Sequence, residues 1–157
     1  MTPRMLIVLL RVLTFIESSD GQFVYNEETG ATGPLQVTSI CLREVNERYG
    51  TSHTMQDMYG TAPSRHVATL YWRMWGCGGY EDCAKTWHGG PQWADKKGVV
   101  KARIDAYWAK VQALIPAEER AYDERERIRK WQAEWMALCI RDYNRLQASR
   151  RTTWQAQ

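Results

Sequence analysis

Residues 4–18 read RMLIVLLRVLTFIES, a stretch in which apolar side chains occupy most positions. Such a stretch predicts a helix that is buried on nearly all sides. It is shorter than the roughly 20 residues that a membrane-spanning helix needs, and Arg11 interrupts it. No small-x-small cleavage site follows, so we expect the first helix of a folded domain and neither a transmembrane segment nor a signal peptide.

The composition is that of a globular protein. The chain has 157 residues, of which 44% are hydrophobic and 25% are charged, enough for one domain with a sizeable core. A net charge of +3 is too balanced for a strong nucleic-acid binder, so no nucleic-acid partner is expected. The eight Trp and eight Tyr residues suit a core and also an amphipathic, sugar-like ligand.

The four cysteines have no Cys-x-x-Cys spacing, which indicates neither a zinc site nor a redox motif. We expect no metal and no cofactor. Cys77 and Cys83 flank a short loop that contains Gly-Gly-Tyr, and they would form a disulfide in an oxidising compartment. Four unpaired, partly buried thiols are the alternative.

The remainder of the first part of the chain also has the pattern of helices joined by turns. Residues 19–34 are rich in turn-forming Gly, Asn and Asp, and a short hairpin would fit there. Further helices are expected from about 39 to 48, 63 to 74, 80 to 87 and 98 to 114. No convincing series of strands appears, so the sequence predicts a mainly α fold.

The composition changes after Pro116, which we expect to close the preceding helix. Residues 117–148 contain no Gly or Pro and predict one long helix. Its apolar stripe has 3-4-3 spacing and consists of Ile128, Trp131, Trp135 and Leu138. We therefore expect a domain over 1–116 and a helical extension over 117–157. The stripe is expected to pack on the domain, and self-association of the helix is the alternative.

Four short motifs carry the residues with chemical potential. Glu17-Ser18 ends the apolar helix, where apolar surroundings and the negative helix end both favour a protonated carboxyl, as a general acid requires. The other motifs are Gly33-Pro34-Leu35-Gln36-Val37, Ala68-Thr69-Leu70-Tyr71 and Thr86-Trp87-His88-Gly89-Gly90. Taken singly, each is more typical of a turn, a core helix or a surface residue.

In this order, the four motifs resemble the signatures of the soluble lytic transglycosylase and goose-type lysozyme superfamily. Those signatures run Glu-Ser, Gly-Leu-Met-Gln-(Ile/Val), Ala-x-x-Tyr and Ala-Tyr-Asn-x-Gly, and the resemblance covers roughly residues 4–115. It implies a lysozyme-like helical domain that cleaves peptidoglycan glycan strands between N-acetylmuramic acid and N-acetylglucosamine. An enzyme of the lytic transglycosylase type is therefore expected, with peptidoglycan as its partner.

The resemblance also implies a role for each matching residue. Glu17 matches the catalytic residue, which first protonates the glycosidic oxygen and then, as a base, deprotonates the C6 hydroxyl of the sugar to give a 1,6-anhydro product. The matching substrate-binding positions are Ser18, Gln36, Tyr71, Trp87 and His88. Trp87 and His88 stand where the family usually has Tyr and Asn, which leaves the substrate preference open.

Two alternatives to this mechanism remain. A water-using muramidase needs a second carboxylate, and Glu27 and Glu28 are the candidates because goose-type enzymes carry an acidic residue in this loop. A weakly catalytic protein that binds or assembles cell wall, with the C-terminal helix as its working part, is the alternative from another class. With no clear signal peptide, a phage-type protein that reaches the wall by release or injection is suggested.

Overall fold

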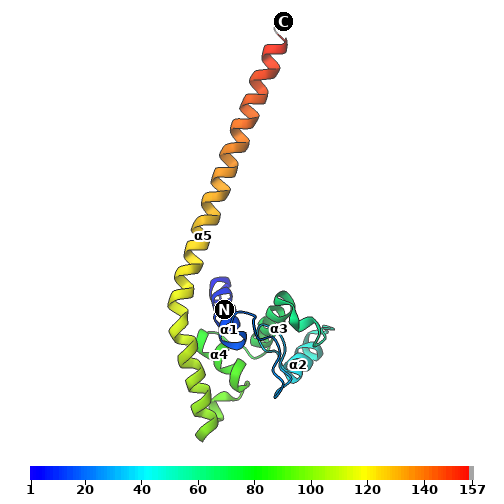
Figure 1. Ribbon diagram of the computed structural model, residues 1–157, viewed down its shortest axis with the longest axis vertical. Helices are drawn as coiled ribbons and strands as arrows, with labels where there is room; N and C mark the ends of the chain where they lie inside the picture. The colour runs from blue at the N-terminus through cyan, green and yellow to red at the C-terminus, as the bar shows by residue number, and fades with distance from the viewer. Residues whose placement is uncertain (156–157) are drawn as a thin grey trace. The chain divides into compact units, whose positions relative to one another are not determined.

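The computed structural model describes the backbone of residues 1–155 and the side chains of residues 1–145 (Figure 1). The chain is 72% helical, and the described residues form no strand, so the predicted mainly α fold is confirmed. Five α-helices follow one another as α1 (Pro3–Ser18), α2 (Ser39–Tyr49), α3 (Thr61–Met74), α4 (Tyr80–Gly89) and α5 (Gly98–Gln155). Short 3-10 helices cover Asp57–Tyr59 and Trp93–Asp95. No helix in this described part combines the length and the apolar character needed to cross a bilayer.

The apolar N-terminal stretch forms α1, as predicted. The expectation that this helix is buried on nearly all sides is wrong, because the face that carries Ile7, Arg11 and Phe15 is exposed. The Thr2 hydroxyl caps the helix by accepting a hydrogen bond from the Met5 N–H at 3.2 Å. Val8, Leu9 and Leu13 have no exposed surface. The helix ends where Ser19 adopts a left-handed conformation with φ of 50°. Glu17 therefore lies in the last turn of a helix that packs one apolar face inside the domain.

Helices α3 and α4 are joined through a buried indole. Trp72 on α3 has no exposed surface, and its Nε1–H donates to the backbone carbonyl of Cys83 on α4 at 2.9 Å. The indole thus satisfies its single polar group inside the core. The four cysteines are free thiols; three of them are buried, and Cys139 is exposed.

The segment between α1 and α2 is a compact loop with two isolated antiparallel bridges, Tyr25–Thr32 and Thr32–Val37. The expected short hairpin is thus reduced to single bridges. Gly33 in this loop has φ of +85° and packs so closely on the Met58 backbone that a Cβ would overlap the Met58 carbonyl. Only glycine satisfies both the backbone conformation and the close approach.

Helix α5 continues through the position where the sequence predicted a break. The expectation that Pro116 closes one helix, with a second helix after it, is wrong, because Pro116 lies inside α5. Proline removes one backbone donor, the N–H that would bond the Gln112 carbonyl, and its ring crowds that carbonyl, at a cost of about 3 kcal/mol. Val111 and Ile115 are buried just before Pro116, and good helix formers follow it. Packing and helix propensity therefore offset the cost of the proline, and the helix continues.

The chain divides into two compact units, Met1–Glu119 and Arg120–Gln157, and the division falls inside α5. The first unit reaches Glu119 because this part of α5 makes polar contacts with the earlier helices. Glu119 lies 3.7 Å from Arg4 of α1 and accepts a hydrogen bond from the Tyr80 hydroxyl of α4 at 3.0 Å. Glu118 lies 3.1 Å from Arg11 of α1.

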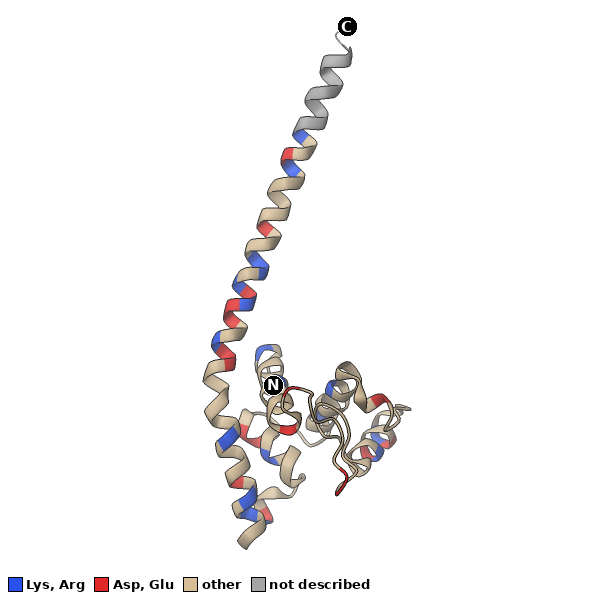
Figure 2. Cartoon of the chain, viewed as in Figure 1, with Lys and Arg blue, Asp and Glu red and all other residues tan. Residues whose placement is uncertain are grey.

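The second unit carries the apolar stripe. Its four side chains are between 43% and 61% exposed, and the Trp131 and Trp135 rings stack with centroids 6.2 Å apart. Charges of both signs alternate along this unit (Figure 2). Arg129 pairs with Glu126 at 2.6 Å, one turn away. The expected packing of the stripe on the domain, and its alternative of self-association, stay predictions.

Replacement of Gly33 by alanine tests the close approach to Met58. We expect Gly33→Ala to lower the free energy of unfolding by about 3 kcal/mol or more, because a backbone clash adds to the left-handed strain. Gly21→Ala is the matched control, since Gly21 has φ of +87° and no described atom lies within 4 Å of its Cβ position. The control is expected to cost about 1 kcal/mol in urea unfolding, and equal losses in both variants would contradict the packing argument.

Candidate active site

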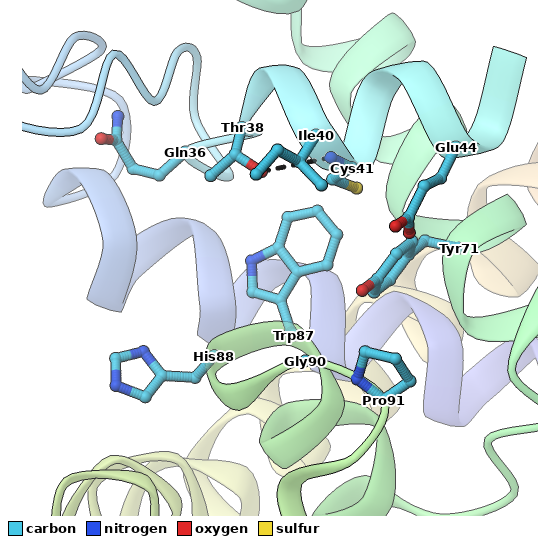
Figure 3. Close-up of a pocket in the computed structure, with 10 residues that line it drawn as sticks. All are labelled: Gln36, Thr38, Ile40, Cys41, Glu44, Tyr71, Trp87, His88, Gly90 and Pro91. Carbon is cyan, nitrogen blue, oxygen red and sulfur yellow. Dashed lines mark hydrogen bonds between the residues drawn. The ribbon is translucent and has the colours of Figure 1, made fainter. Parts of the chain in front are cut away.

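A cavity of about 300 Å³ is lined by the end of the loop before α2, by α2 and α3, and by the end of α4 (Figure 3). Four of the predicted substrate-binding residues line it together: Gln36, Tyr71, Trp87 and His88. The other lining residues are Thr38, Ile40, Cys41, Glu44, Gly90 and Pro91. Three of the four sequence motifs therefore contribute side chains to one concave surface.

The indole of Trp87 occupies the centre of this group, between Tyr71 and His88 in the view of Figure 3. Its Nε1–H donates to the Leu35 backbone carbonyl at 3.1 Å, which ties the end of α4 to the glycine-containing motif. Its ring meets Tyr71 edge to face at 5.9 Å and Trp72 at 5.8 Å. Such edge contacts fix the orientation of an aromatic wall.

Gln36 is held in an unusual backbone conformation. Its φ is 53°, in the left-handed region that few non-glycine residues adopt. The side-chain Nε2 donates to the Gly33 carbonyl at 3.0 Å and to the Phe23 carbonyl at 3.2 Å. The amide nitrogen is thus committed to the loop, and Oε1 is the atom of this amide that can accept a hydrogen bond from a ligand hydroxyl.

The carboxyl group of Glu17 lies in an environment that disfavours its charge. Burial raises its pKa to about 7, and a hydrogen bond from Tyr107 partly opposes the rise. The Tyr107 hydroxyl donates to Glu17 Oε1 at 2.6 Å. Near neutral pH this carboxyl is present in comparable amounts as acid and as carboxylate. A group in that state can both give and take a proton.

Glu17 itself is not among the residues that line the cavity. Tyr107 connects it to the cavity wall. Tyr107 is on α5 and is 6% exposed. Its other ring contact is with His88, whose imidazole stacks on the phenol with centroids 4.1 Å apart and planes 4° apart. A chain of two contacts therefore runs from Glu17 through Tyr107 to His88 at the cavity.

Sequence reasoning did not identify Tyr107. Its spacing contains a usable signal, because Ile104, Tyr107, Val111 and Ile115 follow a helical period and are all buried. A tyrosine on the apolar face of a helix needs a polar partner for its hydroxyl. The partner, Glu17, lies 90 residues earlier in the chain, and no local pattern indicates such a distant pairing.

Ser18 is 1% exposed and is not among the residues that line the cavity. Its hydroxyl lies 2.9 Å from the Thr14 carbonyl and 2.9 Å from the Pro34 carbonyl, and it accepts a hydrogen bond from the Gly21 N–H. These contacts fasten the loop to the last turn of α1. The structure thus places Ser18 as a support for the loop beside Glu17.

Glu27 and Glu28 lie in the turn that the isolated bridge between Tyr25 and Thr32 closes. Both are exposed, and neither lines the cavity. The loop is folded on Asn26, whose Oδ1 accepts from the backbone N–H of Glu28 at 3.0 Å. Among the described residues, no group of three or more His, Cys, Asp or Glu side chains is arranged to hold a metal ion.

Comparisons with protein-family models, with curated proteins and with solved structures find no significant match to this chain. Any assignment of function therefore depends on the motifs and on the geometry described above.

The raised pKa of Glu17 predicts a measurable dependence of stability on pH. The carboxyl binds its proton more tightly in the folded chain than in the unfolded chain. Its favourable contribution is therefore complete below the ordinary glutamate pKa of 4.5 and is lost as pH rises through about 7. Relative to Glu17→Gln, the wild-type free energy of unfolding should fall by about 3 kcal/mol between pH 4 and pH 8. Urea unfolding of both proteins across this range measures the difference, and a constant difference would show that the carboxyl is not perturbed.

Proposed function

We propose that this protein is a lytic transglycosylase that cleaves peptidoglycan between N-acetylmuramic acid and N-acetylglucosamine. The observation that carries the proposal is a partly buried carboxyl with a pKa near 7, which two successive contacts join to a cavity lined by three of the family-like motifs. The fold that goes with this proposal is a lysozyme-like helical domain. Peptidoglycan glycan strands are the proposed partner.

The cavity has the chemistry of a sugar-binding surface. Trp87 and Tyr71 present aromatic rings, which pack against the apolar faces of pyranose rings. Gln36, Thr38 and Glu44 supply polar atoms beside them, which suit sugar hydroxyl and acetamido groups. A shallow wall of this mixed character fits a glycan strand better than a small apolar ligand.

The proposed reaction uses Glu17 twice. In its acid form Glu17 donates a proton to the glycosidic oxygen while the bond between that oxygen and C1 of N-acetylmuramic acid breaks. The resulting carboxylate then removes the proton from the C6 hydroxyl of the same sugar, whose oxygen forms the new bond to C1. The proton that Glu17 lost is thereby restored, no water is consumed, and the product ends in a 1,6-anhydro ring.

Two observations favour this elimination over hydrolysis. A pKa near 7 allows one carboxyl to act first as acid and then as base at the same pH. Hydrolysis with a second carboxylate would use Glu27 or Glu28, and both side chains are exposed and do not line the cavity.

Replacement of the proposed acid is the first test. We expect Glu17→Gln to lose at least 100-fold in wall cleavage, because glutamine keeps the size of the side chain but has no transferable proton. Turbidity loss of purified bacterial walls measures the rate, and far-UV circular dichroism checks the fold. Glu47→Gln, at an exposed position on α2, is the control and should cleave at the wild-type rate. Cleavage by Glu17→Gln near the wild-type rate would exclude the assignment.

Product mass and the loop carboxylates separate the two chemistries. We expect fragments lighter by one water than hydrolytic products, and we expect Glu27→Gln and Glu28→Gln each to stay within about threefold of the wild-type rate. A loss at either position comparable with that of Glu17→Gln, together with hydrated products, would favour a muramidase. Wall binding without any cleavage by the wild-type protein would favour a cell-wall-binding protein.

A further inference from the structure

The stacking of His88 on Tyr107 has a chemical consequence for Glu17. Because the Tyr107 hydroxyl donates to Oε1 at 2.6 Å, Oε1 of the neutral carboxyl is the acceptor, carbonyl-type oxygen. The acid proton then resides on Oε2. The direction of one phenol O–H bond thus decides which carboxyl oxygen presents the proton.

The end of α4 is held firmly against α5 at this point. Lys85 on α4 is 6% exposed and forms ion pairs with Glu81 at 2.7 Å and with Asp105 of α5 at 2.9 Å. At Gly89 the helices approach so closely that a Cβ would lie 2.8 Å from Ile104 Cγ1. These contacts lie on either side of His88 in α4 and fix the position of His88 along the axis of α5.

The His88 ring therefore covers one face of the phenol with its plane only 4° from parallel. With the ring centroids 4.1 Å apart, the imidazole restricts tilting of the phenol toward the cavity, since the stacked rings are in van der Waals contact. Glu17 faces Tyr107 from α1, and Lys110 faces His88 from α5. Burial and the Lys110 charge both lower the pKa of His88, which favours the neutral form of the stacked ring.

We propose that His88 is a positioning residue whose ring, by stacking on Tyr107, holds the phenol hydroxyl on Oε1 of Glu17 and so keeps the transferable proton on Oε2. This role rests on the proposed function of Glu17 as the acid. It differs from a direct contact with sugar, and it requires a planar ring at position 88.

Titration of the ligand-free protein tests the proposal independently of catalysis. The Glu17 pKa is measured by carbon-13 NMR of labelled glutamate carboxyls, with the Glu17 signal assigned from Glu17→Gln. Tyr107→Phe removes the donor and should raise the Glu17 pKa by about 1, because that hydrogen bond favours the carboxylate. His88→Ala and His88→Asn should raise it by about 0.5, because the hydroxyl then spends less time on Oε1.

His88→Phe is the conservative variant, and it should leave the Glu17 pKa unchanged because phenylalanine keeps a planar ring over Tyr107. His66→Ala removes a histidine from α3, away from Tyr107, and should also change nothing. The proposal is overturned if His88→Ala and His88→Asn titrate like the wild type, if His88→Phe shifts as much as His88→Ala, or if Tyr107→Phe has no effect. Thermal unfolding identifies any variant that does not fold. The Glu17 pKa in the remaining His88 variants then shows whether the ring at position 88 positions Tyr107.

Cleavage assays separate this proposal from the proposed function. If the wild type does not cleave walls, the function is wrong, but the titrations still show whether His88 orients Tyr107. If the wild type cleaves, a positioning role lowers kcat of His88→Ala, whereas a role confined to sugar binding raises KM and leaves the ligand-free Glu17 pKa unchanged.

Discussion

One partly buried hydrogen bond, from the Tyr107 hydroxyl to Glu17, holds the candidate site together. It joins the last turn of α1 to α5, and it sets the balance between two opposing effects on a single carboxyl. Exclusion of water favours the neutral acid, and the phenol donor favours the carboxylate. Without burial the group would lose its proton well below neutral pH, and without the phenol it would hold the proton more tightly and be a weaker acid.

The end of α4 connects the environment that sets the Glu17 pKa to the cavity where a ligand would bind. Trp87 points to the cavity centre and is tied to the Leu35 carbonyl, whereas the adjacent His88 covers the ring of Tyr107. Two neighbouring residues on one helical turn thus contact two different elements, the loop before α2 and helix α5. Movement of α4 would change the aromatic wall and the environment of the acid together.

Local patterns in the sequence were sufficient to predict the mainly α fold and an apolar first helix. The family resemblance named Gln36, Tyr71, Trp87 and His88 as candidate binding residues, and the structure brings these four side chains to one cavity. Pro116 misled the prediction because one missing hydrogen bond costs less than the packing and the helix propensity around it provide. Tyr107 was missed because its partner is distant in the chain. Ser18 shows a third limit, since a motif position does not reveal whether a hydroxyl faces a ligand or supports a loop.

The half-titrated state of Glu17 couples ligand binding to proton uptake. Near its pKa of about 7, only part of the population carries the proton. A ligand whose oxygen accepts that proton in a hydrogen bond binds the protonated molecules preferentially and draws the others into the same state. Each binding event then takes a fraction of a proton from the solvent, so the heat of binding depends on the ionisation enthalpy of the buffer, and the apparent affinity declines as the solution becomes alkaline.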